Sequence, residues 1–89
     1  MQPDLEDLIK KGQVLDSSKK YEEAIKCYDK AIEKNPKNAQ IYVYKCNSLK
    51  NMYKLKEAIN CYNIAIDLDP NNSMAIKNKK HIAKDMISQ

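Results

Sequence analysis

The sequence predicts an all-α fold built from two helical hairpins and one further helix, and three observations predict it. Residues 5–38 and 39–72 are identical at 12 of 34 aligned positions, where chance would give about 2. Apolar residues in both units recur every three or four positions, which is the period of an amphipathic helix. Gly12 is the only glycine, so the chain lacks the turn residues that β-hairpins need.

The apolar period and its interruptions place five helices along the chain. We expect them over 4–17, 21–34, 39–52, 55–68 and 73–87. The 89 residues suffice for one small domain. We divide it into a first repeat over 5–38, a second repeat over 39–72 and a last helix over 73–88.

Prolines and polar residues mark the expected helix ends. Pro36 and Pro70 follow the second and fourth helices and prevent them from continuing. Pro3 stands in the first turn of the first helix, where a proline costs no hydrogen bond. Asn38 and Ser73 can cap the helices that begin after them.

The residue types inside the two repeats follow one pattern of large, small and aromatic side chains. The first repeat carries Leu8, Gly12, Leu15, Ala24, Tyr28, Ala31 and Pro36, and the second carries Tyr42, Cys46, Leu49, Ala58, Tyr62, Ala65 and Pro70. This pattern resembles the tetratricopeptide repeat (TPR). The resemblance implies an α-solenoid, in which antiparallel hairpins stack with a right-handed superhelical twist and 73–88 is the capping helix.

Close approach of the helices explains the small residues of this pattern. We expect Gly12 and Cys46 to let the first helix of each hairpin lie against the second, where Ala24 or Ala58 faces it. Tyr28 and Tyr62 should then fill the wedge between neighbouring repeats.

A column of lysines replaces the leucine that the family often carries. Lys11, Lys45 and Lys79 are spaced by the repeat length. A lysine can lay its stem along the neighbouring helix and keep its ammonium group in water. We therefore interpret the column as solvated rather than as a binding site.

Composition argues against catalysis and against metal or cofactor chemistry. Cys27, Cys46 and Cys61 are an odd number without the paired spacing of a zinc or redox site, so we expect them to be reduced and buried. His81 stands alone on a basic helix, which is typical of a surface residue. No catalytic constellation is visible, and we predict no enzyme, no cofactor, no metal and no small-molecule substrate.

The charge pattern makes nucleic acid an improbable partner. All 16 cations are lysines, against 12 acids, and their excess lies in residues 73–89. The absence of arginine removes the usual chemistry of phosphate and guanine recognition. The tyrosines other than Tyr28 and Tyr62 are more typical of packing between helices than of nucleobase stacking; these are Tyr21, Tyr42, Tyr44 and Tyr53.

No stretch approaches the roughly 18 apolar residues of a membrane span, and the N-terminus carries no signal-peptide pattern. We therefore expect no membrane association and a cytoplasmic location.

The family resemblance also implies a function, because the first helix of each TPR hairpin lines a concave groove that holds a peptide of another protein. Apolar groove residues should anchor side chains of the peptide, amides should hold its backbone, and the cations of the last helix suit an acidic segment. We expect Tyr44 to point into this groove, so that Tyr44→Ala weakens binding with little loss of stability. The candidate groove residues are Ile9, Gln13, Val43, Tyr44, Asn47, Met74, Lys77, Asn78 and His81.

Three alternatives stay open at this stage. Co-chaperone members of the family clamp the C-terminal carboxylate of a chaperone tail, but the positions matching that motif here are Ile9, Gln13, Tyr44, Met74 and Asn78, and they carry no cation. If the motif is matched one repeat later, Asn47 and Asn78 fit both of its asparagine positions, but Val43 replaces the lysine and the sequence lacks the further repeat. The repeats could instead assemble into a homodimer or exchange helices. The lysines of the last helix could also bind nucleic acid weakly, with an affinity that falls with salt.

Overall fold

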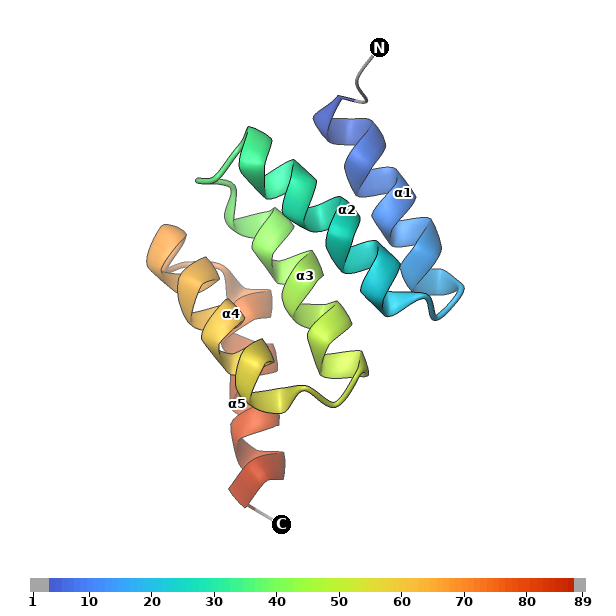
Figure 1. Cartoon of the computed structure of the whole chain (residues 1–89). Coiled ribbons are helices and arrows are strands. Elements are labelled where there is room, and N and C mark those ends of the chain that lie inside the picture. The colour runs from blue at the N-terminus through green and yellow to red at the C-terminus, as the bar shows by residue number, and fades with distance from the viewer. Residues whose placement is uncertain (1–3, 88–89) are drawn as a thin grey trace.

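The computed structural model describes residues 4–87, and every secondary-structure element within that range is an α-helix. Figure 1 shows two antiparallel hairpins followed by a single helix. The helices are α1 (Leu5–Ser17), α2 (Tyr21–Lys34), α3 (Ala39–Asn51), α4 (Leu55–Leu68) and α5 (Ser73–Ile87). The predicted all-α repeat fold is confirmed, and the helix ends differ from the expected ones by at most one residue.

The helices form two layers of unequal spacing. Each hairpin pairs α1 with α2 or α3 with α4, and α3 also packs on α2 while α5 packs on α4. In one layer α3 contacts both α1 and α5, whereas α2 and α4 of the other layer stay apart. The layer of α1, α3 and α5 is therefore the more closely spaced, so it lies on the concave side of the stack. We call its solvent-facing surface the inner face.

Side-chain oxygens cap three of the helices at their first turns. Asp4 accepts a hydrogen bond from the backbone of Asp7 at 2.8 Å and so precedes α1 as its cap. Asn38 caps α3 as expected. At α5 the cap is Asn72, whose Oδ1 accepts from the backbone of Ala75 at 3.0 Å, so the expectation that Ser73 caps this helix is wrong. Pro3 lies outside the described residues.

The turn within each hairpin repeats the same hydrogen-bond pattern. Lys19 and Tyr53 follow α1 and α3 in the left-handed region, with φ of 63° and 60°. The backbone N–H of the residue after each donates to a leucine carbonyl five positions earlier, at 2.8 Å from Lys20 and 3.0 Å from Lys54. This is the Schellman ending, which normally carries glycine because other residues are strained there.

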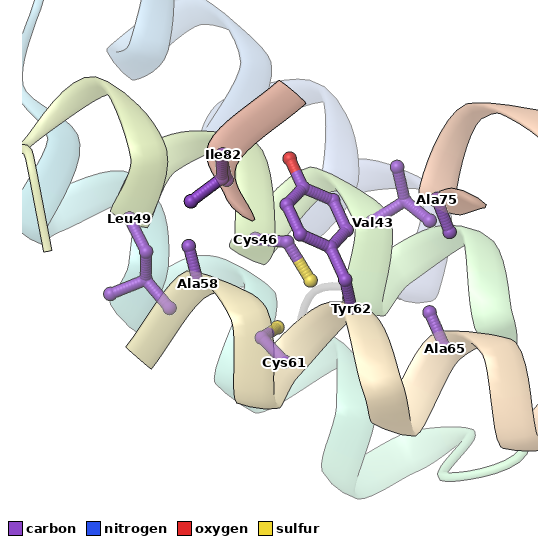
Figure 2. Close-up of a cluster of buried hydrophobic side chains, with 9 residues drawn as sticks. All are labelled: Val43, Cys46, Leu49, Ala58, Cys61, Tyr62, Ala65, Ala75 and Ile82. Atoms are coloured by element: carbon purple, nitrogen blue, oxygen red, sulfur yellow. The ribbon is translucent and has the colours of Figure 1, made fainter. Parts of the chain in front are cut away.

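The interior consists of two clusters of buried side chains, one for each hairpin. The first lies among α1, α2 and the first turns of α3 and includes Leu8, Tyr28 and Ile41. The second lies among α3, α4 and α5, and Figure 2 shows it with the ring of Tyr62 at its centre. Tyr28 and Tyr62 are both fully buried, as expected. The three cysteines are also buried and unpaired, as expected.

The tyrosine of the first hairpin lies directly over Gly12. A Cβ added at Gly12 would approach the Cε1 atom of Tyr28 to 2.4 Å, so no larger residue fits there without moving the ring. The glycine therefore accommodates the ring of Tyr28 rather than the expected close contact with Ala24. The Tyr28 hydroxyl donates to Asp16 at 2.6 Å, and Asp16 also accepts from the buried Ser48 of α3 at 2.7 Å. One carboxylate thus ties the two repeats together.

Helix α5 covers the end of the second hairpin in the manner of a cap. Ala75 and Ile82 are buried in the second cluster, and Met86 packs against it. Lys80 stands at the repeat position that Gly12 and Cys46 occupy in α1 and α3, and it is exposed. A lysine at this position keeps the outer side of α5 in water, whereas the small residues of α1 and α3 allow a neighbouring helix to pack closely against them.

Candidate functional site

The nine candidate groove residues fall into three groups in the structure. Four of them are exposed and four are half-buried, while one is fully buried. The exposed residues are Gln13, Met74, Lys77 and His81, the half-buried ones are Ile9, Tyr44, Asn47 and Asn78, and the buried one is Val43.

Val43 is part of the core and cannot contact a partner. Its exposed fraction is 0%, and it belongs to the second cluster together with Ala75 of α5. Figure 2 shows its side chain beside Ala75. The prediction that Val43 lines the groove is wrong because α3 is the central helix of its layer and is covered from both sides. Its repeat equivalents Ile9 and Lys77 lie on outer helices and stay accessible.

Tyr44 is also engaged inside the molecule, although it keeps some exposure. It packs against the first cluster, and its ring centroid lies 5.8 Å from that of Tyr28 at an interplanar angle of 30°. A tyrosine in such a contact holds the two repeats together. The expectation that Tyr44 projects freely into the groove therefore needs correction, and its loss should reduce stability.

Asn47 and Asn78 form the polar centre of the inner face. The Nδ2 atom of Asn78 on α5 donates to the Oδ1 atom of Asn47 on α3 at 3.1 Å. The same Oδ1 accepts a short hydrogen bond from the buried hydroxyl of Tyr62. A tyrosine hydroxyl is protonated at neutral pH and can donate, and burial raises the pKa of Tyr62 further. The tyrosine and the two amides thus fix one another across three helices.

These contacts leave the Asn47 Nδ2 group and the second N–H of the Asn78 Nδ2 group as donors, and the Asn78 Oδ1 atom as an acceptor. Asn47 keeps its Nδ2 group and Asn78 keeps its Oδ1 atom, since neither atom has a hydrogen bond among the described residues. No side-chain nitrogen or oxygen in that part of the chain is both buried and without a partner. The two atoms are therefore open to solvent, and they match the C=O and N–H groups of a peptide backbone.

A hollow of about 690 Å³ lies at the C-terminal end of α3, beside the second half of α5, and Tyr21 of α2 and Leu55 of α4 also line it. We call it the α3–α5 hollow. Lys50 and Asn51 line it from α3, and His81 and Asp85 line it from α5. Of the nine candidates, only His81 belongs to this hollow.

Tyr53 borders the α3–α5 hollow and is a feature that sequence reasoning missed. It is 84% exposed, so the expectation that it packs between helices is wrong. Its position in the repeat could have indicated this exposure. Tyr53, like Lys19, follows the first helix of a hairpin at a position where glycine is usual. A bulky residue held at positive φ and left in solvent is a candidate contact residue.

The lysine column contains one specific interaction. Lys45 of α3 forms an ion pair with Asp29 of α2 at 2.7 Å, which links the two repeats. Burial lowers the pKa of Lys45, but the ion pair outweighs burial and raises it above the ordinary value. The interpretation of a solvated column is therefore wrong for Lys45, although Lys11 is exposed.

The described residues offer neither a metal site nor a membrane-spanning helix. No group of three or more histidine, cysteine or acidic side chains in 4–87 is arranged to hold a metal ion. None of the helices is long and apolar enough to cross a bilayer.

Comparisons with known proteins agree with this geometry. Residues 7–38 and 39–72 each match a family model described as a tetratricopeptide repeat. No curated protein matches the chain. Among solved structures, the chain is similar to the TPR2B domain in the pHsp70 complex of yeast Sti1, with a TM-score of 0.87, 26% identity and coverage of 92% of this chain. This chain spans 66% of that structure's length.

Two other solved structures have the same fold. The second TPR domain of Spaghetti (RPAP3), bound to the HSP90 peptide SRMEEVD, matches with a TM-score of 0.87 at 24% identity over 94% of this chain and 78% of that one. The D159K mutant of MamA matches with a TM-score of 0.80 at 25% identity, covering 93% of this chain and 46% of that one.

Proposed function

Because the chain belongs to the tetratricopeptide-repeat family, we propose that it is a non-catalytic interaction module that holds a peptide segment of another protein on its inner face. The peptide lies across α3 and α5, where the Asn47–Asn78 pair holds its backbone. A neighbouring side chain of the peptide enters the α3–α5 hollow.

The amide pair is the observation that carries this proposal. Asn47 and Asn78 are fixed by each other and by Tyr62, so little side-chain freedom is lost when a peptide binds. The open Nδ2 and Oδ1 atoms offer a donor and an acceptor side by side. This combination binds an extended backbone without reading its sequence, while the hollow supplies the selectivity.

The comparison with the Sti1 domain supports a peptide ligand but a different way of holding it. That domain was solved in a complex with pHsp70. In this chain the positions of a carboxylate clamp carry Ile9, Gln13, Tyr44, Met74 and Asn78, none of which is a cation. Recognition therefore rests on the peptide backbone rather than on a terminal carboxylate.

The charges near the site favour an acidic segment. Lys77 and His81 are exposed on α5, on either side of Asn78. Residues 73–89 contain four lysines and a single acid, Asp85. An Asp or Glu of the peptide next to the backbone contact is attracted by this field, and the affinity should fall moderately with salt.

The test is a selection of peptides from a displayed library on the intact chain, followed by calorimetric titration. We expect Asn78→Leu to weaken the selected peptides about tenfold, because the variant removes one backbone contact and frees Asn47. The matched control is Asn60→Leu, the same change at an exposed position of α4 in the outer layer. Equal affinity for wild type and Asn78→Leu would refute the site.

The peptide SRMEEVD serves as a second probe in the same titration. It binds a TPR domain of the same fold. Since the clamp cations are missing here, we expect it to bind far more weakly than the selected peptides. Tight binding of SRMEEVD would show that this chain binds the terminal carboxylate of the peptide through groups other than the clamp cations.

A further inference from the structure

The two hairpins carry the same surface, but only one copy of it is covered. A hollow of about 540 Å³ lies between α2 and α4 above α3, and we call it the α2–α4 hollow. A hollow of about 410 Å³ lies on the outer side of the first hairpin, and we call it the end hollow. Seven of the eight residues that line the end hollow stand 34 positions before a residue that lines the α2–α4 hollow.

In the second hairpin this surface receives a helix of the preceding repeat. Helix α2 forms one wall of the α2–α4 hollow. Its Ile25 packs against the second core cluster, and its Asp29, one turn later, pairs with Lys45 at 2.7 Å. Helix α2 thus contacts this surface through an apolar residue and a carboxylate that stand one turn apart.

The end hollow contains the equivalents of the groups that receive α2. Lys11 stands where Lys45 does, and Cys27 stands where Cys61 does. No other helix of the described residues lies against this side of the first hairpin. Lys11 is exposed there, and within residues 4–87 it makes no ion pair.

The end hollow also carries a small net positive charge. Lys26 and Lys30 line it at the positions that Asn60 and Ile64 occupy in the α2–α4 hollow. Together with Lys11 they outnumber the acids of the end hollow, Asp7 and Glu23. A helix docking here meets a net positive charge, which selects for carboxylates.

We propose that the end hollow docks an acidic amphipathic helix of a partner protein, which continues the stack as α2 does within the chain. An apolar residue of that helix lies on Leu15 and Cys27, and a carboxylate one turn later pairs with Lys11. This surface is separate from the inner face, so both partners can bind at once and either proposal can fail alone.

The probe is a labelled synthetic peptide with the sequence of residues 20–35, which contains α2, titrated onto the full chain by fluorescence anisotropy. We expect saturable binding that Lys11→Glu weakens roughly three- to tenfold, as for a partly exposed ion pair whose charge is reversed. A peptide carrying Asp29→Lys should bind the Lys11→Glu variant better than the wild-type chain.

The matched control is Lys10→Glu, which changes net charge equally at the neighbouring position, outside the end hollow. Thermal melts verify that both variants fold. Equal weakening by Lys10→Glu and Lys11→Glu, or no binding at millimolar concentration, would overturn the proposal. Self-association of the chain alone that Lys11→Glu abolishes would assign the end hollow to a second copy and overturn the acidic partner.

Discussion

The two hairpins place a tyrosine at the same position of the repeat and anchor its hydroxyl differently. In the first, Tyr28 lies over Gly12 and donates to the carboxylate of Asp16. In the second, Cys46 replaces the glycine, and Tyr62 donates to the amide of Asn47. The hairpin that has cysteine in place of glycine thus also has a different acceptor for the tyrosine hydroxyl. Asn47 stands three positions before the residue of α3 that corresponds to Asp16.

The difference between the two anchors bears on function. Asp16 is engaged by the hydroxyls of Tyr28 and Ser48, so its polar atoms serve the contact between the repeats. Asn47 uses only its oxygen internally and keeps its amide nitrogen open. The first interface is therefore built for stability, and the second retains hydrogen-bonding groups for a ligand.

The largest expected effect follows from removing the charged anchor. Asp16→Ala leaves the fully buried hydroxyl of Tyr28 without its acceptor and should lower the free energy of unfolding by about 2–4 kcal/mol. The equivalent change in the second hairpin, Asn47→Ala, removes a neutral acceptor and should lower it by about 1–2 kcal/mol. Urea unfolding of both variants provides the measurement, and equal losses would contradict the comparison.

Making the first hairpin like the second is the next test. Gly12→Cys brings a Cβ into the ring of Tyr28 and should lower the free energy of unfolding by about 1–3 kcal/mol. The usual preference of helices for any residue over glycine acts in the opposite direction. A stabilised Gly12→Cys variant would show that the ring moves freely. Cys46→Ala, which introduces no clash, is the control.

Tyr44→Ala tests the contact between the repeats. The half-buried ring against Tyr28 should contribute about 1–2 kcal/mol to the free energy of unfolding. Tyr44→Phe keeps the ring and should be nearly neutral. If Tyr44→Ala melts like the wild type, Tyr44 belongs to the groove as the sequence alone suggested.

Because two tyrosines are buried, we expect the protein to lose stability at alkaline pH. Burial, followed by the hydrogen bond to Asp16, raises the pKa of Tyr28 above its ordinary value, and burial raises the pKa of Tyr62. A raised pKa in the folded state means that folding favours the protonated form. The stabilisation is complete below the unfolded pKa of about 10 and decreases as the pH rises above it.

The size of this effect should be about 1 kcal/mol for each of the two tyrosines over the pH unit above 10, measured by urea unfolding at a series of pH values. Tyr28→Phe removes one of the two groups and should flatten the decline. An unchanged slope in that variant would assign the decline to other groups.

The smallest expected effect is a gain at the turns. Lys19→Gly and Tyr53→Gly each relieve a positive φ and should raise the free energy of unfolding by about 0.5–1 kcal/mol. Ser18→Gly, at a position with φ of −90°, should give no gain. Thermal melts of the three variants decide between these outcomes, and a loss at both turns would contradict the assigned strain.

The fold could be predicted from the sequence because its determinants are local or periodic. The repeat at 34 residues, the prolines after α2 and α4 and the helical spacing of apolar residues were sufficient to place all five helices. Tyr28 and Tyr62 were assigned to the core correctly because a large aromatic at a repeated apolar position has few other roles.

The candidate site was predictable only in part, because a repeat period does not show how many neighbours a helix has. Ile9, Val43 and Lys77 are equivalent in sequence, yet only Val43 is buried, since α3 alone has a helix on each side within its layer. The partners of Asn47 are 15 and 31 residues away on other helices. Their geometry depends on packing that no local pattern encodes.

The most direct test of the proposed site is the side-chain amide spectrum of Asn47 and Asn78 in ¹H–¹⁵N NMR during titration with a selected peptide. We predict that the Asn47 Nδ2 protons shift downfield, because they gain an acceptor, while the side-chain amides of Asn60 and Asn71 stay in place. Saturable binding that leaves the Asn47 and Asn78 side-chain signals unmoved would contradict the account.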